Sequence, residues 1–124
     1  MNKKYILFII LAILVVGILG YFWIDYNTKP GKLDDFAKCL KDKGAIFYGA
    51  YWCSHCQTQK SLFGKSEKYL PYVECSTPDG NSQLQVCKDN KIESYPTWVF
   101  SDGERKVGEV SLQDLAQKTG CVLP

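Results

Sequence analysis

Two cysteines separated by two residues, Cys53 and Cys56, are the residues of this chain best suited to chemistry. They follow a short apolar run at residues 45–50 and precede a segment with helical character, so the pair is expected in the first turn of a helix. Unpaired backbone N–H groups and the positive end of the helix dipole favour a thiolate there. The pattern predicts thiol–disulfide exchange, in which Cys53 is the attacking nucleophile and Cys56 the resolving thiol.

The only histidine of the chain, His55, lies between the two cysteines. When charged, it would stabilise the Cys53 thiolate further, and a stabilised thiolate makes the disulfide a stronger oxidant. The alternative is a histidine that is merely solvated. A Cys-x-x-Cys pair also binds metals, but zinc needs four ligands and the sequence has no second closely spaced pair. We therefore expect neither a metal site nor a cofactor.

A second element is the run from Ser94 to Thr97, whose proline, Pro96, follows Cys53 by 43 residues and precedes a predicted strand. Such a proline could simply begin the strand. Together with the cysteine pair, it is expected instead to form a cis peptide bond and to present backbone to a substrate chain beside the disulfide. Pro96 is thus counted as a site residue. A substrate groove is predicted along Trp52, Ser54, Tyr95 and Thr97.

The elements that would position these motifs alternate along the chain. Helices are predicted at residues 32–43, 54–69, 83–91 and 111–119, and strands at 45–50, 72–75, 97–100 and 106–110. Strands that alternate with helices favour parallel pairing, and the last two strands form an antiparallel hairpin around Gly103. The sequence predicts an α/β fold with a central mixed sheet of about four strands flanked by helices.

The N-terminal segment does not belong to this domain. Residues 5–24 carry no charge, and a helix of this length spans about 30 Å, the thickness of the hydrocarbon core of a bilayer. A cleaved signal peptide would have a shorter apolar region that ends in small residues, whereas bulky aromatics follow Gly20 here. We expect a short tail at 1–4, a transmembrane signal anchor at 5–24, a linker at 25–32 and a domain at 33–124. Lys3 and Lys4 weakly favour a cytoplasmic N-terminus.

Composition excludes several functional classes. Apolar residues make up 46% and charged residues 23% of the chain, as in ordinary globular proteins. The 15 Lys and Arg nearly balance the 13 Asp and Glu and form no basic run, which gives no electrostatic reason to bind nucleic acid. The six cysteines all lie in the domain. Such a density indicates disulfides and an oxidising compartment.

The turn at Trp52 to Cys56, followed at this distance by Tyr95 to Thr97, resembles the thioredoxin superfamily over residues 45–120. More narrowly, the chain is similar to the thioredoxin-like domain of bacterial homologues of vitamin K epoxide reductase. This similarity rests on residues 47–56 (FYGAYWCSHC), 62–65 (LFGK), 72–75 (YVEC), 95–98 (YPTW) and 111–112 (SL). In that family the domain lies outside the cytoplasm, exchanges disulfides with folding proteins and is reoxidised by a quinone-linked membrane reductase domain. Here a single predicted helix replaces that membrane domain, so the resemblance implies a membrane partner that acts in trans.

Two positions depart from the relatives. The dipeptide between the cysteines is Ser54-His55, where many relatives have Pro-His. Phe47 stands six residues before Cys53, where thioredoxins commonly carry a buried acid that relays protons to the resolving thiol. Without that acid, deprotonation of Cys56 should be slower, which suits an oxidant better than a fast reductase.

The resemblance also implies how the other four cysteines pair. Cys75 and Cys87 are bridged in the family, which leaves Cys39 and Cys121 to tie the two ends of the domain together. Loop entropy gives about 3 kcal/mol for the short loop and about 4.5 kcal/mol for the long one. The rival interpretation is that one of these pairs is a second redox relay.

The sequence thus predicts a thioredoxin-like enzyme, a single-pass, membrane-anchored thiol–disulfide oxidoreductase whose domain is extracytoplasmic and donates disulfides to proteins with cysteine thiols. Its reoxidising partner would be a vitamin K epoxide reductase-like membrane protein. Two alternatives stay open. One is a disulfide reductase, for example in cytochrome c maturation, and the other is a non-catalytic peptide-binding module of the same fold.

Overall fold

A computed structural model describes residues 2–124 and divides the chain into two compact units, one that ends at Pro30 and one from Gly31 to Pro124. The first unit is a single helix, α1 (Lys3–Thr28), with a mean hydropathy of 2.8 over its most apolar stretch and no buried residue. It is long and apolar enough to cross a membrane. Near its C-terminal end, Lys29 pairs with Asp25 at 2.7 Å.

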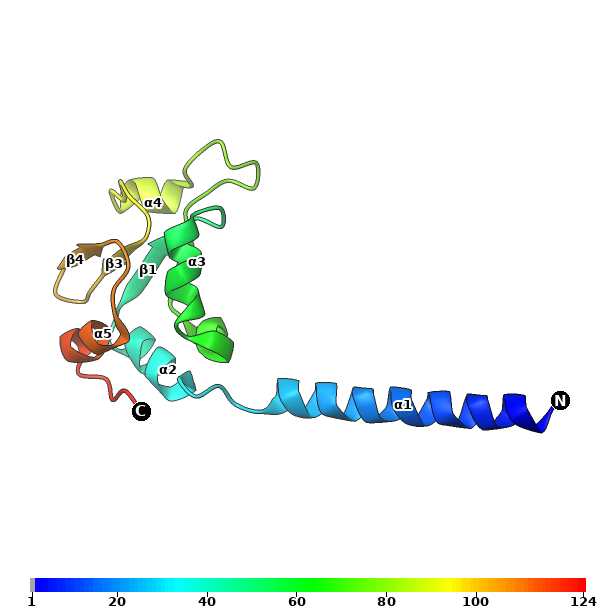
Figure 1. Ribbon diagram of the computed structural model, residues 1–124. Helices are drawn as coiled ribbons and strands as arrows, with labels where there is room; N and C mark the ends of the chain where they lie inside the picture. Colours follow the sequence, from blue (N-terminus) through cyan, green and yellow to red (C-terminus); the bar gives the residue numbers. More distant parts are fainter. Residues whose placement is uncertain (1) are drawn as a thin grey trace. The chain divides into compact units, whose positions relative to one another are not determined.

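The second unit is built on a four-stranded sheet with the order β2-β1-β3-β4. Strands β1, β3 and β4 are labelled in Figure 1. Its strands are β1 (Ile46–Gly49), β2 (Tyr72–Glu74), β3 (Thr97–Val99) and β4 (Arg105–Val107). The pair β1–β2 is parallel, whereas β1–β3 and β3–β4 are antiparallel. The predicted α/β fold with a mixed sheet of about four strands is confirmed.

Helices pack on both faces of the sheet because its two central strands, β1 and β3, are largely apolar on both. Phe47 of β1 and Trp98 of β3 stack at 5.0 Å between ring centroids. They share one core with residues of α2 (Asp34–Asp42), α3 (Ser54–Ser61) and α5 (Leu112–Thr119). Tyr48, which points to the other face, packs with Cys87 of the short helix α4 (Gln85–Asp89).

The expectation of parallel pairing is wrong for β3. After β2, a disulfide between Cys75 and Cys87 and a hydrogen bond from Leu84 N to Cys75 O (2.7 Å) keep α4 at the carboxyl end of that strand. The chain therefore re-enters the sheet from this end, and β3 runs opposite to β1.

The single helix predicted over residues 54–69 is also wrong. The α-helix ends at Ser61, and a 3₁₀ helix, η1 (Gly64–Tyr69), follows. Gly64 has a φ of +52°, in the left-handed region, which interrupts a right-handed helix. The break lets Phe63 turn inward, where its ring stacks on Phe36 of α2 at 6.0 Å.

Candidate active site at the start of helix α3

Cys53 and Cys56 form a disulfide at the N-terminus of α3, which the chain reaches directly from β1 (Figure 1). Cys53 is the N-cap residue, and its Sγ accepts a hydrogen bond from Cys56 N at 3.2 Å. Cys53 is 7% exposed, whereas Cys56 is fully buried. Of the two cysteines, Cys53 alone keeps some exposed surface, so it is the one on which a thiolate from outside would act.

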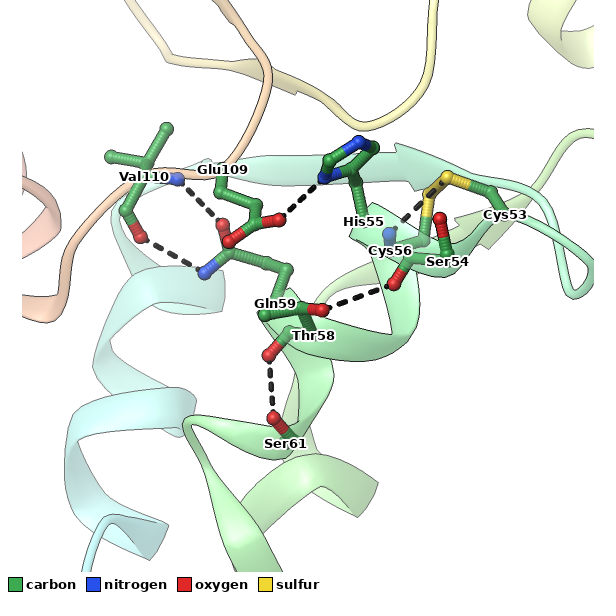
Figure 2. A network of polar contacts seen from close by, with 9 residues as sticks. All are labelled: Cys53, Ser54, His55, Cys56, Thr58, Gln59, Ser61, Glu109 and Val110. Carbon is green, nitrogen blue, oxygen red and sulfur yellow. Dashed lines mark hydrogen bonds and ion pairs between the residues drawn. A yellow bond between two sulfur atoms is a disulfide. The ribbon is translucent and has the colours of Figure 1, made fainter.

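His55 is exposed and faces a carboxylate that comes from a distant part of the chain (Figure 2). Its Nδ1 lies 2.7 Å from Oε1 of Glu109, a residue of the segment between β4 and α5. The predicted position of His55 beside the cysteines is thus accompanied by an acidic partner. Nothing in the sequence pointed to Glu109, because it lies 54 residues further along the chain.

A buried glutamine holds the segment that carries Glu109 against α3. Gln59, which is 0% exposed, donates from Nε2 to the carbonyl of Val110 (3.0 Å) and accepts from its N–H at Oε1 (2.7 Å). Figure 2 shows these two bonds one helical turn from Cys56, next to the contact between His55 and Glu109. Gln59 was also missed by sequence reasoning, although a polar residue three positions after a buried cysteine on a helix is a usable signal.

The aromatic residues expected around the disulfide are brought together. The rings of Trp52 and Tyr95 meet edge to face at 6.0 Å between centroids, and Trp52 Nε1 donates to Ser76 Oγ at 2.8 Å. The peptide bond between Tyr95 and Pro96 is cis. Ser54 is exposed in the first turn of α3.

Thr97 departs from the expected groove. Its side chain is 3% exposed and its hydroxyl donates to the carbonyl of Ser94 at 2.7 Å. As the first residue of β3, it pairs with Tyr48 and Val107 inside the sheet. Thr97 is therefore buried and its hydroxyl proton is engaged within the chain, so its side chain is not open to a substrate.

The other four cysteines pair as Cys39–Cys121, with Cα atoms 5.9 Å apart, and as Cys75–Cys87, with Cα atoms 5.6 Å apart. The first bond joins α2 to the segment after α5, and the second joins the end of β2 to α4. Within residues 2–124, no group of three or more His, Cys, Asp or Glu side chains is arranged to hold a metal ion. The chemistry that this arrangement supports is that of the Cys53–Cys56 disulfide itself.

Comparison with known proteins connects this geometry to a family. The thioredoxin family model matches residues 29–119. The protein "Thiol-disulfide oxidoreductase LTO1" of Arabidopsis thaliana is 47% identical over 89 residues, which cover 68% of this chain and 23% of that protein. "Thioredoxin domain-containing protein 2" of Mus musculus is 35% identical over 86 residues, which cover 63% of this chain and 16% of that protein. The chain thus spans less than a quarter of the length of either relative.

Proposed function

This chain belongs to the thioredoxin family, and we propose that it is a membrane-anchored thiol–disulfide oxidoreductase that donates disulfides to proteins outside the cytoplasm. The observation that carries the proposal is the asymmetry of the Cys53–Cys56 disulfide. Cys53, at the start of the helix, keeps a small exposed fraction of 7%, and Cys56 in the first turn is fully buried. This is the arrangement that sequential exchange requires, with one sulfur for the client and one for resolution.

The reaction follows from that asymmetry. A client thiolate attacks Cys53 Sγ, a bond forms between the two sulfurs, and the Cys53–Cys56 bond breaks with its electron pair on Cys56. A second client thiolate then attacks the client sulfur of this mixed disulfide and releases Cys53 as a thiolate. The client is oxidised by two electrons and the Cys53–Cys56 pair is reduced by two. Backbone N–H groups at the start of α3 stabilise the departing Cys53 thiolate.

The anchor and the compartment are supported by separate features. Helix α1 has the length and the hydropathy of a membrane span. All six cysteines are paired in disulfides, as in proteins of oxidising compartments outside the cytoplasm. We place the N-terminus in the cytoplasm and the thioredoxin-like domain on the other side of the membrane.

The partner that restores the disulfide is proposed from the resemblance to the thioredoxin-like domain of vitamin K epoxide reductase homologues. Such a partner is a separate membrane protein that passes two electrons from Cys53 and Cys56 to a quinone. The name of the Arabidopsis relative, a thiol–disulfide oxidoreductase, agrees with the chemistry. It does not specify the direction of electron flow, which has to be measured.

The test is the reduction potential of the Cys53–Cys56 pair in the full-length chain, held in detergent micelles and equilibrated with glutathione buffers. A potential of roughly −120 to −180 mV, as in disulfide donors, would support the proposal. A potential near thioredoxin's roughly −270 mV would indicate a reductase instead. In cells, the Cys53 thiolate of Cys56→Ser should attack disulfides of client proteins or of the membrane reoxidase, displace one of their sulfurs as a thiolate and accumulate in mixed disulfides. Cys53→Ser, its matched control, should accumulate none. If Cys56→Ser traps neither clients nor a reoxidase, the exchange mechanism is refuted.

A further inference from the structure

Under the proposed function, Cys56 is the thiol that resolves a mixed disulfide, and the present inference rests on that role. Only a thiolate can attack a disulfide, so Cys56 must lose its proton before it can resolve a mixed disulfide on Cys53. Cys56 is fully buried, so bulk water does not reach its sulfur. Phe47, on strand β1 and six residues before Cys53, is apolar and fully buried as well. A proton acceptor has to come from another element.

Cys56 packs closely against the backbone of β1 at a glycine. Gly49 is the last residue of this strand, and a Cβ added there would lie 3.0 Å from Cys56 Sγ and 2.9 Å from Cε2 of Tyr72. The sulfur and the edge of the tyrosine ring therefore both approach the bare face of Gly49. No side chain of β1 separates them at this position.

Strand β2, which pairs with β1 at Gly49, carries a carboxylate. Glu74 of β2 is the register partner of Gly49, and Tyr72 is the register partner of Phe47. Residues two apart on a strand point to the same face, and neighbouring strands lie about 4.8 Å apart. Glu74 and Tyr72 thus lie on the face of the sheet that Cys56 covers, one strand away from it.

Hydrogen bonds hold the Glu74 carboxylate in place. Oε1 accepts from the backbone N–H groups of Ser76 (2.9 Å) and Tyr51 (3.2 Å), and Oε2 accepts from the hydroxyl of Tyr72 (2.7 Å). Burial, followed by this hydrogen bond, raises the pKa of the Tyr72 hydroxyl well above its ordinary value. Tyr72 therefore keeps its own proton and acts as a donor that orients Oε2.

We propose that Glu74 accepts the proton that Cys56 must lose before it resolves the mixed disulfide, and that Tyr72 positions the carboxylate for this transfer. The proton passes from Cys56 Sγ to Glu74 Oε2 on the face of the sheet where Gly49 has no side chain. The sulfur electron pair then attacks Cys53 Sγ, the Cys53–Cys56 bond forms, and the bond from Cys53 to the client breaks with its electron pair on the client thiolate. Glu74, which is partly exposed, returns the proton to solvent. In the reverse direction it gives the same proton to the leaving Cys56.

The other charged and titratable groups around Tyr72 come from the helices that cover it and from the loop before β3. The Lys60 ammonium of α3 lies 3.6 Å from the centroid of the Tyr72 ring and 3.9 Å from the Glu67 carboxylate of η1. Tyr95 also acts on the Tyr72 hydroxyl electrostatically. Glu67 has no hydrogen bond to Tyr72 among those described, so it provides a matched control for the removal of a nearby carboxylate.

The test follows a glutathione adduct on Cys53 in the full-length chain in detergent micelles. Reduced protein is mixed with oxidised glutathione, quenched with acid at intervals and analysed by mass spectrometry, which separates formation of the adduct from its decay by Cys56 attack. In Glu74→Gln, formation should stay within about twofold of the unaltered chain, while decay at pH 7 should slow by about 100-fold or more, as for the loss of a general base. The difference should shrink towards pH 9, where hydroxide replaces the carboxylate. Glu67→Gln should decay at the unaltered rate, and Glu74→Asp should restore part of the loss.

The sign of the effect separates proton transfer from other roles of Glu74. Removal of a negative charge near Cys56 would by itself favour its thiolate and speed the decay. The glutamine keeps an oxygen for the N–H groups of Tyr51 and Ser76, so the local backbone is preserved. Decay at the unaltered rate, or a slowing that is equal at every pH, would overturn the inference. An unaltered chain that forms no adduct at all would overturn the proposed function and this inference with it.

Discussion

The two buried hydrogen bonds between Gln59 and Val110 should contribute more to the free energy of unfolding of this domain than most of its other side-chain hydrogen bonds. Gln59→Leu keeps the volume of the side chain but leaves the N–H and the carbonyl of Val110 without their partners. Both bonds are buried, and each unpaired buried group costs about 1–3 kcal/mol. The free energy of unfolding should therefore fall by about 2–4 kcal/mol, after allowance for some access of water once the segment moves.

Urea denaturation of the full-length chain in micelles, followed by tryptophan fluorescence, measures this loss. The matched control is Gln57→Leu on the same helix, where an exposed side chain makes one hydrogen bond to the Tyr51 carbonyl, and it should cost less than about 1 kcal/mol. Hydrogen exchange at the Val110 amide should accelerate in Gln59→Leu only. If Gln59→Leu is as stable as the control, the hydrogen bonds of Gln59 do not hold the segment around Val110 against α3.

Two further predictions concern stability. Replacing both Cys39 and Cys121 by alanine opens a loop with a sequence separation of 82 residues and should lower the free energy of unfolding by about 4.5 kcal/mol, because the unfolded chain gains the entropy of that loop. The reduction potential of Cys53–Cys56, measured in glutathione buffers, should not change. The second concerns alkaline pH. Since the folded-state pKa of Tyr72 is raised by burial and by Glu74, Tyr72 stabilises the fold below its unfolded pKa of about 10 and loses this contribution as pH rises further. Denaturation at pH 9 and pH 11 should show a steeper loss in the unaltered chain than in Tyr72→Phe, and equal losses would refute this assignment.

Local sequence features were sufficient for the parts of the fold that depend on near neighbours. The apolar run of β1, the cysteine pair after it and Ser111, which caps α5 by accepting from Asp114 N (3.0 Å), are each read from a few adjacent residues. The break in the helix after Ser61 was harder, because a glycine at position 64 is compatible with a helix until packing of Phe63 favours the turn.

The parts that sequence reasoning missed are contacts between distant segments. Glu109 meets His55, and Val110 meets Gln59, across 54 and 51 residues. The direction of β3 depends on where α4 is held, and the position of Glu74 opposite Gly49 depends on the register of β1 and β2. The sequence alone shows that Phe47 stands where thioredoxins commonly carry a buried acid. A carboxylate on another strand, such as Glu74, can be related to that position only once the pairing of the strands is known.

The burial of the Cys75–Cys87 disulfide argues against its being a second redox relay. Both cysteines are fully buried, so a thiolate cannot approach this bond along its axis without local unfolding. The segment between Cys75 and Cys87 also supplies the hydroxyl of Ser76 to Trp52 (2.8 Å) and the amide of Gln83 to Tyr95 (2.7 Å). This bond therefore braces the two aromatic residues beside the active disulfide. A mild donor, such as millimolar glutathione, should reduce Cys53–Cys56 and leave Cys75–Cys87 oxidised, as counted by thiol alkylation and mass spectrometry. Reduction of Cys75–Cys87 at the same potential would revive the relay, because it would show that its sulfurs exchange in the folded protein.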